Sequence, residues 1–226
     1  MKKNRFIPFL IVILSVALLV IVYMFVFNPA GKINEGTFRV NDVVIKSVIN
    51  VAEIENQETP KSISDIKFNT SQNNEITLLI AKGNEAKNIY IDNIKVKSSS
   101  NVGEIKVSEG EKELVSLSQT DKVNIYPIEE NGQYLVKLNI DNIDFLKNAN
   151  VPSDSESVTF DGTMLKLMNI KISDIKLEVK FNLNIVDNTG KINICKFNFN
   201  IPEEDLITNG ISVTRKDSGN YKFYIK

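Results

Sequence analysis

The chain has 226 residues, with 27 basic and 28 acidic side chains, a net charge of -1 at pH 7, no histidine and a single cysteine. The missing histidine excludes Ser-His-Asp and Cys-His catalysis and removes the commonest zinc ligand. A single cysteine forms no internal disulfide. The balanced, interspersed charge gives no electrostatic footprint for nucleic acid, whose binding needs clustered basic residues.

An uncharged apolar run occupies residues 6–27. At about 1.5 Å per residue it forms a helix of roughly 33 Å, which matches a hydrocarbon core of about 30 Å. A cleaved signal peptide has a shorter apolar region, of about 7 to 15 residues, and then a small-x-small cleavage site. The exit from this run, Asn28-Pro29-Ala30, fits that site poorly. We therefore predict a single transmembrane helix that stays uncleaved.

Basic residues set the predicted orientation of this helix. Lys2, Lys3 and Arg5 precede the run, and such residues are retained on the cytoplasmic side of a membrane. We expect residues 1–5 to be a cytoplasmic tail and residues 28–36 to be a linker. The predicted localisation is the cell membrane, single-pass, with the N-terminus cytoplasmic and the C-terminal domain extracytoplasmic.

After the linker, apolar and polar residues alternate with the period of a β-strand. In residues 177–185 the odd positions are apolar, and Asp187-Asn188-Thr189-Gly190 then supplies a turn. The return strand starts with apolar residues on even positions and switches to odd positions at Cys195, a phase change that predicts a β-bulge. The other clear strands are predicted at residues 76–80, 89–96, 123–128, 134–140, 211–215 and 221–225.

Short polar turns between these strands predict an all-β fold, an antiparallel β-sandwich. A weak internal repeat indicates two of them, because Ile-Ser-Asp-Ile-Lys at residues 63–67 recurs at residues 172–176. In each half an expected hairpin follows the motif, with Gly83 or Gly190 in its turn, and a second expected hairpin comes later. The glycines of these later turns are Gly132 and Gly219.

The repeat predicts one sandwich at residues 37–147, a linker at 148–157 and a second sandwich at 158–226. The strand-turn-strand sequence pattern between Leu79 and Val96 resembles that of bacterial immunoglobulin-like modules. Two tandem immunoglobulin-like sandwiches are therefore the expected form. A single larger sandwich is the alternative, since isoleucine, serine, aspartate and lysine are common enough here for short matches to arise by chance.

No catalytic residue is predicted. Cys195 falls on the apolar face of its predicted strand, where a buried thiol behaves as a small hydrophobe. A sortase would need a histidine and the motif Thr-Leu-x-Thr-Cys, where this chain has Ile-Asn-Ile-Cys. A Ser-Lys signal peptidase has a Ser-Met pair after its anchor, and this chain contains no such pair. We therefore expect a protein that is not an enzyme.

Carboxylates are the remaining candidate site residues. Asp154, Glu156 and Asp161 lie close together at the expected junction, and calcium takes six to eight oxygens from such loops. They are the candidate calcium ligands, although their spacing is not that of a dedicated calcium loop. Asp141 and Asp144 form a second close pair, and paired acids serve glycosidases. For both sets, acids that solvate loops and strand ends are the simpler interpretation, and no cofactor is predicted.

Two classes of function remain. The first is a membrane-anchored, extracytoplasmic, non-catalytic interaction or structural module of the bacterial cell envelope, whose partners are the lipid bilayer through residues 6–27 and another envelope protein. The tether would raise its effective concentration near that partner. The alternative is an extracytoplasmic ligand-binding or calcium-stabilised domain, or a hydrolase without histidine. A composition rich in asparagine, lysine and isoleucine is typical of AT-rich bacterial genomes. The last strand, with Tyr221, Phe223, Tyr224 and Ile225, is one candidate edge for a partner strand, although core packing is the expected role of Phe223 and Ile225.

Overall fold

The computed structural model describes residues 35–54, 62–98, 103–109, 112–113, 122–153, 155, 159, 161–202 and 206–226. The chain divides into two compact units, Met1–Asn34 and Glu35–Lys226. The predicted transmembrane run at residues 6–27 lies outside the described residues. Among the residues that are described, no helix is long and apolar enough to cross a membrane.

The described unit is nearly all β-strand, and its strand pairs are antiparallel, which confirms the predicted fold class at this level. Its strands are β1 (Glu35–Ile54), β2 (Lys67–Ala81), β3 (Ala86–Ser98), β4 (Glu104–Glu109), β5 (Lys112–Glu113), β6 (Val123–Asn124), β7 (Ile128–Glu130), β8 (Gln133–Asn150), β9 (Leu177–Asp187), β10 (Ile192–Ile201), β11 (Ile211–Lys216) and β12 (Lys222–Ile225). Its short helices are α2 (Met164–Leu167), α3 (Leu206–Asn209) and the 3-10 turns η1 (Ile63–Asp65), η2 (Ile172–Asp174) and η3 (Ser218–Asn220).

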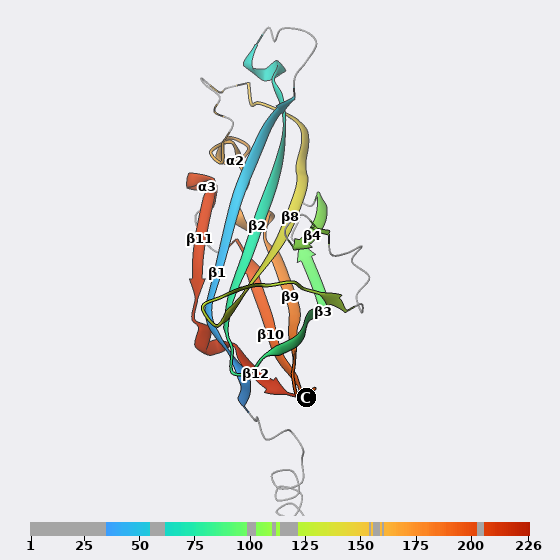
Figure 1. Cartoon of the computed structure of the whole chain (residues 1–226). Helices are drawn as coiled ribbons and strands as arrows, with labels where there is room; N and C mark the ends of the chain where they lie inside the picture. The colour runs from blue at the N-terminus through green and yellow to red at the C-terminus, as the bar shows by residue number, and fades with distance from the viewer. Residues whose placement is uncertain are drawn as a thin grey trace, which may run out of the picture. The chain divides into compact units, whose positions relative to one another are not determined.

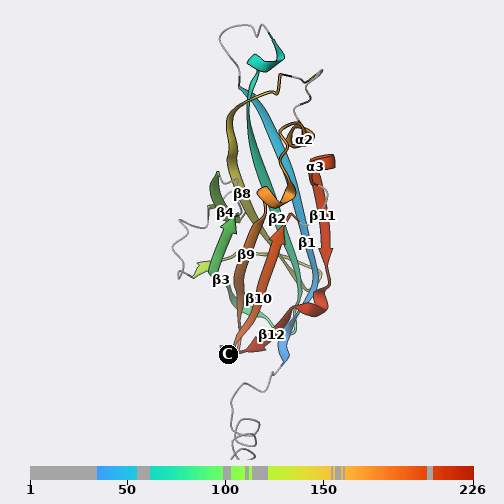
Figure 2. The same cartoon turned by 180° about the vertical axis from the view of Figure 1, so that it is seen from behind.

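One continuous sheet runs through this unit in the order β5-β4-β8-β2-β1-β12-β10-β9-β3-β6, with β11 beside β1 and β7 beside β8. The short strand β12 joins the two parts of the sheet, because one of its edges pairs with β1 and the other with β10. Figures 1 and 2 show β1, β2 and β8 on one side of the unit and β9 and β10 on the other. The sheet therefore folds over on itself in a sandwich-like arrangement.

The main hydrophobic core lies between the two parts of the sheet. Strand β2 buries alternate residues from Phe68 to Ile80, and β9 buries alternate residues from Leu177 onward. One cluster unites Ile76, Leu78 and Ile80 of β2 and the inward apolar residues of β9 with buried residues of β1, β8, β3 and β10. Each fully buried aliphatic or aromatic side chain contributes about 1.5 to 3 kcal/mol relative to exposure to water. This shared core holds the strands of both halves of the sequence together.

The structure does not divide at residues 148–157. Strand β8 runs into this segment as far as Asn150, and the strands on both sides of it share one sheet and one core. Glu35–Lys226 is one compact unit, and the separate sandwiches expected at 37–147 and 158–226 are not found. Among the alternatives weighed from the sequence, the single larger sandwich fits this arrangement.

The Ile-Ser-Asp repeat reproduces local structure only. Both copies form a 3-10 turn, η1 and η2, that leads into a strand. In each turn the aspartate Oδ2 accepts a hydrogen bond from the backbone N–H three residues earlier, at 2.9 Å for Asp65 and 3.0 Å for Asp174. This short-range bond needs only a few residues, so the same motif can precede strands with different neighbours.

Only two of the four expected hairpins exist. Gly190 lies in the turn between the paired strands β9 and β10, and Gly132 lies in the turn between β7 and β8. Gly83 instead connects β2 to β3, which pair with other strands in the two parts of the sheet. Gly219 connects β11 to β12, which both pair with β1 rather than with each other.

The predicted bulge in β10 is wrong, and a real register shift lies in β1. Strand β10 pairs with β9 from Ile192 to Ile201 without interruption, and its odd positions face inward throughout. The apolar pattern predicted a change of phase because the polar residue Asn193 occupies one of the inward positions. Asn193 is buried there and donates from Nδ2 to the Ile185 carbonyl at 3.4 Å. In β1 the register shifts between Val40 and Asp42, which interrupts the alternation and explains why this long strand was not predicted.

Beyond the main core, β1, β2 and β8 continue and are covered by the segments that carry α2 and α3. Two smaller clusters form there, one around Leu165 and Leu206 and one around Phe68 and Met164. The covering segments approach closely at two glycines, since a Cβ on Gly162 would lie 2.0 Å from the Gly210 Cα. No real Cβ contact is that short, so this crossing requires glycine at residue 162.

Candidate functional site

Of the three predicted calcium ligands, only Asp161 lies among the described residues. Asp154 and Glu156 lie outside the described part of the chain, so their role stays a prediction. Asp161 is described, and its Oδ1 accepts hydrogen bonds from the Thr163 hydroxyl at 2.5 Å and the Thr163 N–H at 2.8 Å, which lower the pKa of this carboxyl. Asp161 thereby stabilises the turn before α2. No group of three or more histidine, cysteine or acidic residues suited to a metal occurs within the described ranges.

Asp141 and Asp144, the second pair of acids, form hydrogen bonds with different partners on β2. Asp141 faces outward from β8 and accepts a hydrogen bond from Asn73 Nδ2 at 2.9 Å, while burial raises the pKa of its carboxyl. The backbone N–H of Asp144 donates to Ser71 Oγ at 2.9 Å. A shallow groove of about 310 Å³ runs past Asp141 on the outward face, and Lys46, Glu75 and several asparagines line it. Glu75 forms an ion pair with Lys137 at 3.7 Å.

Cys195 is fully buried on the inward face of β10. Burial raises the pKa of its thiol to about 12, because the thiolate would have to form away from water. The thiol therefore stays protonated near neutral pH and is a poor nucleophile. This environment confirms the expected role of Cys195 as a small hydrophobic core residue.

The C-terminal strand is not the sheet edge that its sequence led us to expect. β12 lies between β1 and β10, so both of its edges have neighbours. Phe223 is buried in the main core, with its ring centroid 6.1 Å from that of Phe38. The candidate docking edge at residues 221–225 is therefore wrong, whereas the expected core packing of Phe223 is confirmed.

An edge does occur one strand earlier, at β11. Among the described strands β11 pairs only with β1, from Val43 opposite Lys216 to Val48 opposite Ile211. Its side chains alternate between half-buried and exposed, and Ile211 and Val213 are 50% and 64% exposed. In Figures 1 and 2 the strand lies along one side of the unit. β11 thus presents an uncovered edge and two apolar side chains within the described part of the chain.

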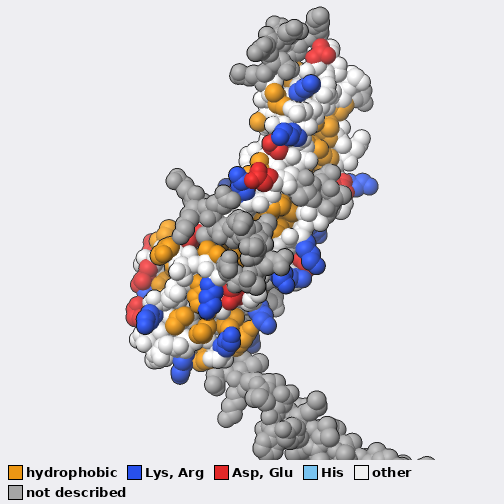
Figure 3. Space-filling view, turned by 90° about the vertical axis from the view of Figure 1, so that its right-hand side faces the viewer, with side chains coloured by type: hydrophobic (Ala, Val, Ile, Leu, Met, Phe, Trp, Pro, Cys, Tyr) orange, Lys and Arg blue, Asp and Glu red, His pale blue; other side chains and the backbone are white. Residues whose placement is uncertain are grey.

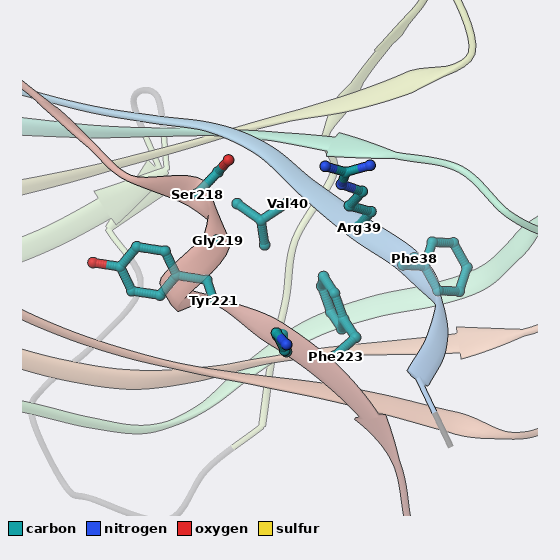
Figure 4. A pocket seen from close by; sticks show the side chains of 8 residues that line it. Phe38, Arg39, Val40, Ser218, Gly219, Tyr221 and Phe223 are labelled. Atoms are coloured by element: carbon teal, nitrogen blue, oxygen red, sulfur yellow. The ribbon is translucent and has the colours of Figure 1, made fainter. Parts of the chain in front are cut away.

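A pocket of about 350 Å³ opens at the place where β1 leaves β12 and begins to pair with β11. We call it the β1–β12 pocket, and Figure 4 shows its walls. Aromatic and aliphatic side chains form one part of its lining, and two cations with a serine and a glycine form the rest. The lining residues are Phe38, Arg39, Val40, Ser218, Gly219, Tyr221, Lys222 and Phe223.

The two cations of this pocket are direct cross-strand neighbours. Arg39 on β1 is the register partner of Lys222 on β12, and both side chains are exposed. Neither forms an ion pair with a carboxylate of the described residues. This pair was not predicted from the sequence, because the two residues lie far apart in the chain and nothing in the local pattern joins them.

One face of the unit carries mixed charge. Figure 3 shows basic and acidic side chains interspersed with apolar ones on one face of the unit.

No protein-family model, no curated protein and no solved structure was found to match this chain. The class of protein that the fold defines is a nearly all-β, antiparallel, sandwich-like unit with an uncovered edge strand and a cationic pocket.

Proposed function

We propose that this protein is a membrane-anchored, extracytoplasmic module of the bacterial cell envelope that binds another envelope protein without catalysing a reaction. The apolar run at residues 6–27 supports the anchor, and the basic residues before it support an exported C-terminal unit. The observation that carries the binding role is the uncovered edge of β11 with its exposed apolar side chains.

An edge strand can accept a further strand, because its outward N–H and C=O groups form main-chain hydrogen bonds while alternate side chains give specificity. Natural edges are commonly blunted by charged residues, and Arg215 and Lys216 blunt one end of β11 in this way. Arg215 is held there by an ion pair with Asp42 at 3.1 Å. Residues 211–214 carry no charge. The partner is therefore an extended segment with apolar residues at alternate positions, which pack on Ile211 and Val213.

Photo-crosslinking in bacterial cells tests this role. The full-length protein carries a photoreactive amino acid at Val213, or at Ile128 of β7 as the control, since these residues are 64% and 59% exposed. We expect a defined crosslinked partner from position 213 and none from position 128. Substitution of Val213 by lysine should abolish co-purification of that partner, whereas Ile128→Lys should not. Equal recovery of the partner with both variants would refute docking at β11.

Protease treatment of spheroplasts tests the anchor and the orientation. External protease should digest a C-terminal tag on the full-length protein, and the protein should sediment with membranes in high salt. A tag that is cleaved only after lysis, or a protein that stays in the soluble fraction, would contradict the proposed topology.

A second function, binding of a small ligand by the extracytoplasmic unit, is favoured by the β1–β12 pocket.

A further inference from the structure

The cations of the β1–β12 pocket have an arrangement that a folded protein without a ligand would not favour. Residues directly opposite on antiparallel strands have Cβ atoms about 4.5 to 5.5 Å apart, and like charges in such pairs are destabilising. Arg39 and Lys222 are opposite in this way, with no carboxylate of the described residues between them. Asp217 directly precedes η3, whose Ser218 and Gly219 line the pocket. Its Oδ1 accepts a hydrogen bond from the Gly219 N–H at 2.9 Å.

Some cations elsewhere on the same sheet are neutralised by a carboxylate. Arg215, which lies further along the β1 edge, pairs with Asp42, and Lys82 pairs with Glu129. Lys95 and Lys180 are also opposite each other, on β3 and β9, but Lys180 forms an ion pair with Glu178. The pair in the pocket differs because neither of its two cations has an ion pair with a described carboxylate. A bound anion would place negative charge between the two cations and replace the repulsion between them with two favourable contacts.

We propose that the β1–β12 pocket binds the phosphate group of a phosphoester between Arg39 and Lys222. A guanidinium offers donors in a planar fork that matches phosphate oxygens, and a lysine adds a compact positive charge. The hydroxyl of Ser218 lines the same pocket and supplies a further donor. Figure 4 shows the Arg39 and Ser218 side chains reaching toward the same side of the pocket.

The apolar wall indicates an ester rather than free inorganic phosphate. Val40, Tyr221 and Phe223 line the pocket beside the cations. The Tyr221 ring stacks on Phe197, with a centroid distance of 5.0 Å and an interplanar angle of 27°, so this wall is firmly supported. A volume of about 350 Å³ lies within the range of small-ligand pockets, about 300 to 1,000 Å³. The substituent of the phosphate then packs on the aromatic wall.

A lipid headgroup is one source of such a phosphoester, and this part of the proposal rests on the proposed membrane anchor. Phe38 follows the end of the apolar run by about eleven residues, which span at most about 40 Å when fully extended. The pocket is therefore tethered within reach of the membrane surface. A soluble phosphoester is the other source, and its binding needs no anchor.

Thermal unfolding of the full-length protein in nonionic detergent, at constant ionic strength, tests the site. The probes are inorganic phosphate, glycerol phosphate and a short-chain, water-soluble phosphatidylglycerol below its micelle concentration. A ligand that binds only the folded state raises Tm as its concentration rises. We expect this rise in the wild type and at least a tenfold loss of apparent affinity in the Arg39→Gln, Lys222→Gln double variant. The matched control is Lys95→Gln with Lys97→Gln, which removes the same charge from exposed positions on β3 and should leave the rise unchanged.

The unliganded variants separate binding from a structural role. Without a ligand, the Tm of Arg39→Gln should equal or exceed that of the wild type, because the substitution removes a repulsion. A lower Tm with no ligand would mean that Arg39 stabilises the fold, and it would overturn the proposal. An absent rise with all three probes, or an equal rise in the double variant, would also overturn it.

The three probes distinguish the sources. A larger rise with the short-chain phosphatidylglycerol than with glycerol phosphate supports a lipid, and equal rises support a soluble phosphoester. Failure of the proposed anchor or of docking at β11 would appear in the protease and crosslinking experiments. Failure of the pocket would appear only in the thermal measurements, so the two outcomes are distinguishable.

Discussion

Substitution of Phe197 by alanine tests whether both halves of the sequence share one cooperative core. Phe197 is 2% exposed on the inward face of β10. Its ring centroid lies 5.1 Å from that of Phe181 and 5.8 Å from that of Phe199, and it also stacks on Tyr221. Removal of a buried phenylalanine ring costs about 3 to 5 kcal/mol. Three aromatic neighbours place Phe197→Ala near the upper end, at about 4 to 5 kcal/mol, because each aromatic pair adds about 0.5 to 1.5 kcal/mol beyond burial.

Hydrogen exchange of the full-length protein in detergent, read by mass spectrometry, measures this loss strand by strand. In a single cooperative unit, the most protected amides exchange by global unfolding and lose protection together. We therefore expect Phe197→Ala to lower the protection of β2 as well as β9. Phe197→Leu keeps part of the apolar volume but loses the aromatic pairs, so it should cost less than Phe197→Ala and lower the protection of the same strands by a smaller amount. Unchanged protection of β2, with a loss confined to residues 158–226, would refute the shared core and support two independent sandwiches.

Three further predictions follow from local environments. Gly162→Ala should overpack the crossing with Gly210 and lower the free energy of unfolding, measured in urea, by about 3 kcal/mol or more. Gly132→Ala, at φ +72 with no atom within 4 Å of a new Cβ, should cost only about 1 kcal/mol of backbone strain. Equal costs for the two variants would contradict the close crossing. The Cys195 thiol should resist an aromatic disulfide reagent at pH 8 and react at once in urea, and rapid labelling of the folded protein would disprove its burial. The Thr189 hydroxyl, which donates to Asp187 at 2.6 Å, holds the pKa of that carboxyl below its usual value of about 3.9. The ionised Asp187 carboxylate therefore stabilises the fold above about pH 4, and this stabilisation is lost as the pH falls through the lowered pKa. The difference in the free energy of unfolding between the wild type and Asp187→Asn should narrow on acidification. A difference that stays constant with pH would contradict this role of Asp187.

Strand positions follow from the amino-acid pattern wherever the alternation is uninterrupted. Residues 177–185 were predicted within β9, and the turn before Gly190 connects it to β10 as expected. The pattern works there because one face of each strand meets the core and the other meets water. It failed at β1, where a register shift breaks the alternation, and at β10, where buried Asn193 imitates a change of phase.

The candidate sites were less predictable than the strands. The inert, buried environment of Cys195 could be expected from its place on an apolar strand face. The β11 edge and the pair of Arg39 and Lys222 could not, since both depend on which strands become neighbours of β1. The repeated Ile-Ser-Asp-Ile-Lys motif forms the same local hydrogen bond in both copies, but it does not predict which strands become neighbours.

Composition and periodicity are local properties, and they account for the antiparallel strands, the excluded chemistries and the expectation of an anchor at residues 6–27. Strand pairing is a long-range property: it depends on which apolar faces bury each other best, and residues distant in the chain take part. That pairing made one core where a repeat predicted two, covered β12 on both edges and left β11 uncovered. It also placed two cations opposite each other at the wall of a pocket, because β1 and β12 pair although they lie far apart in the chain.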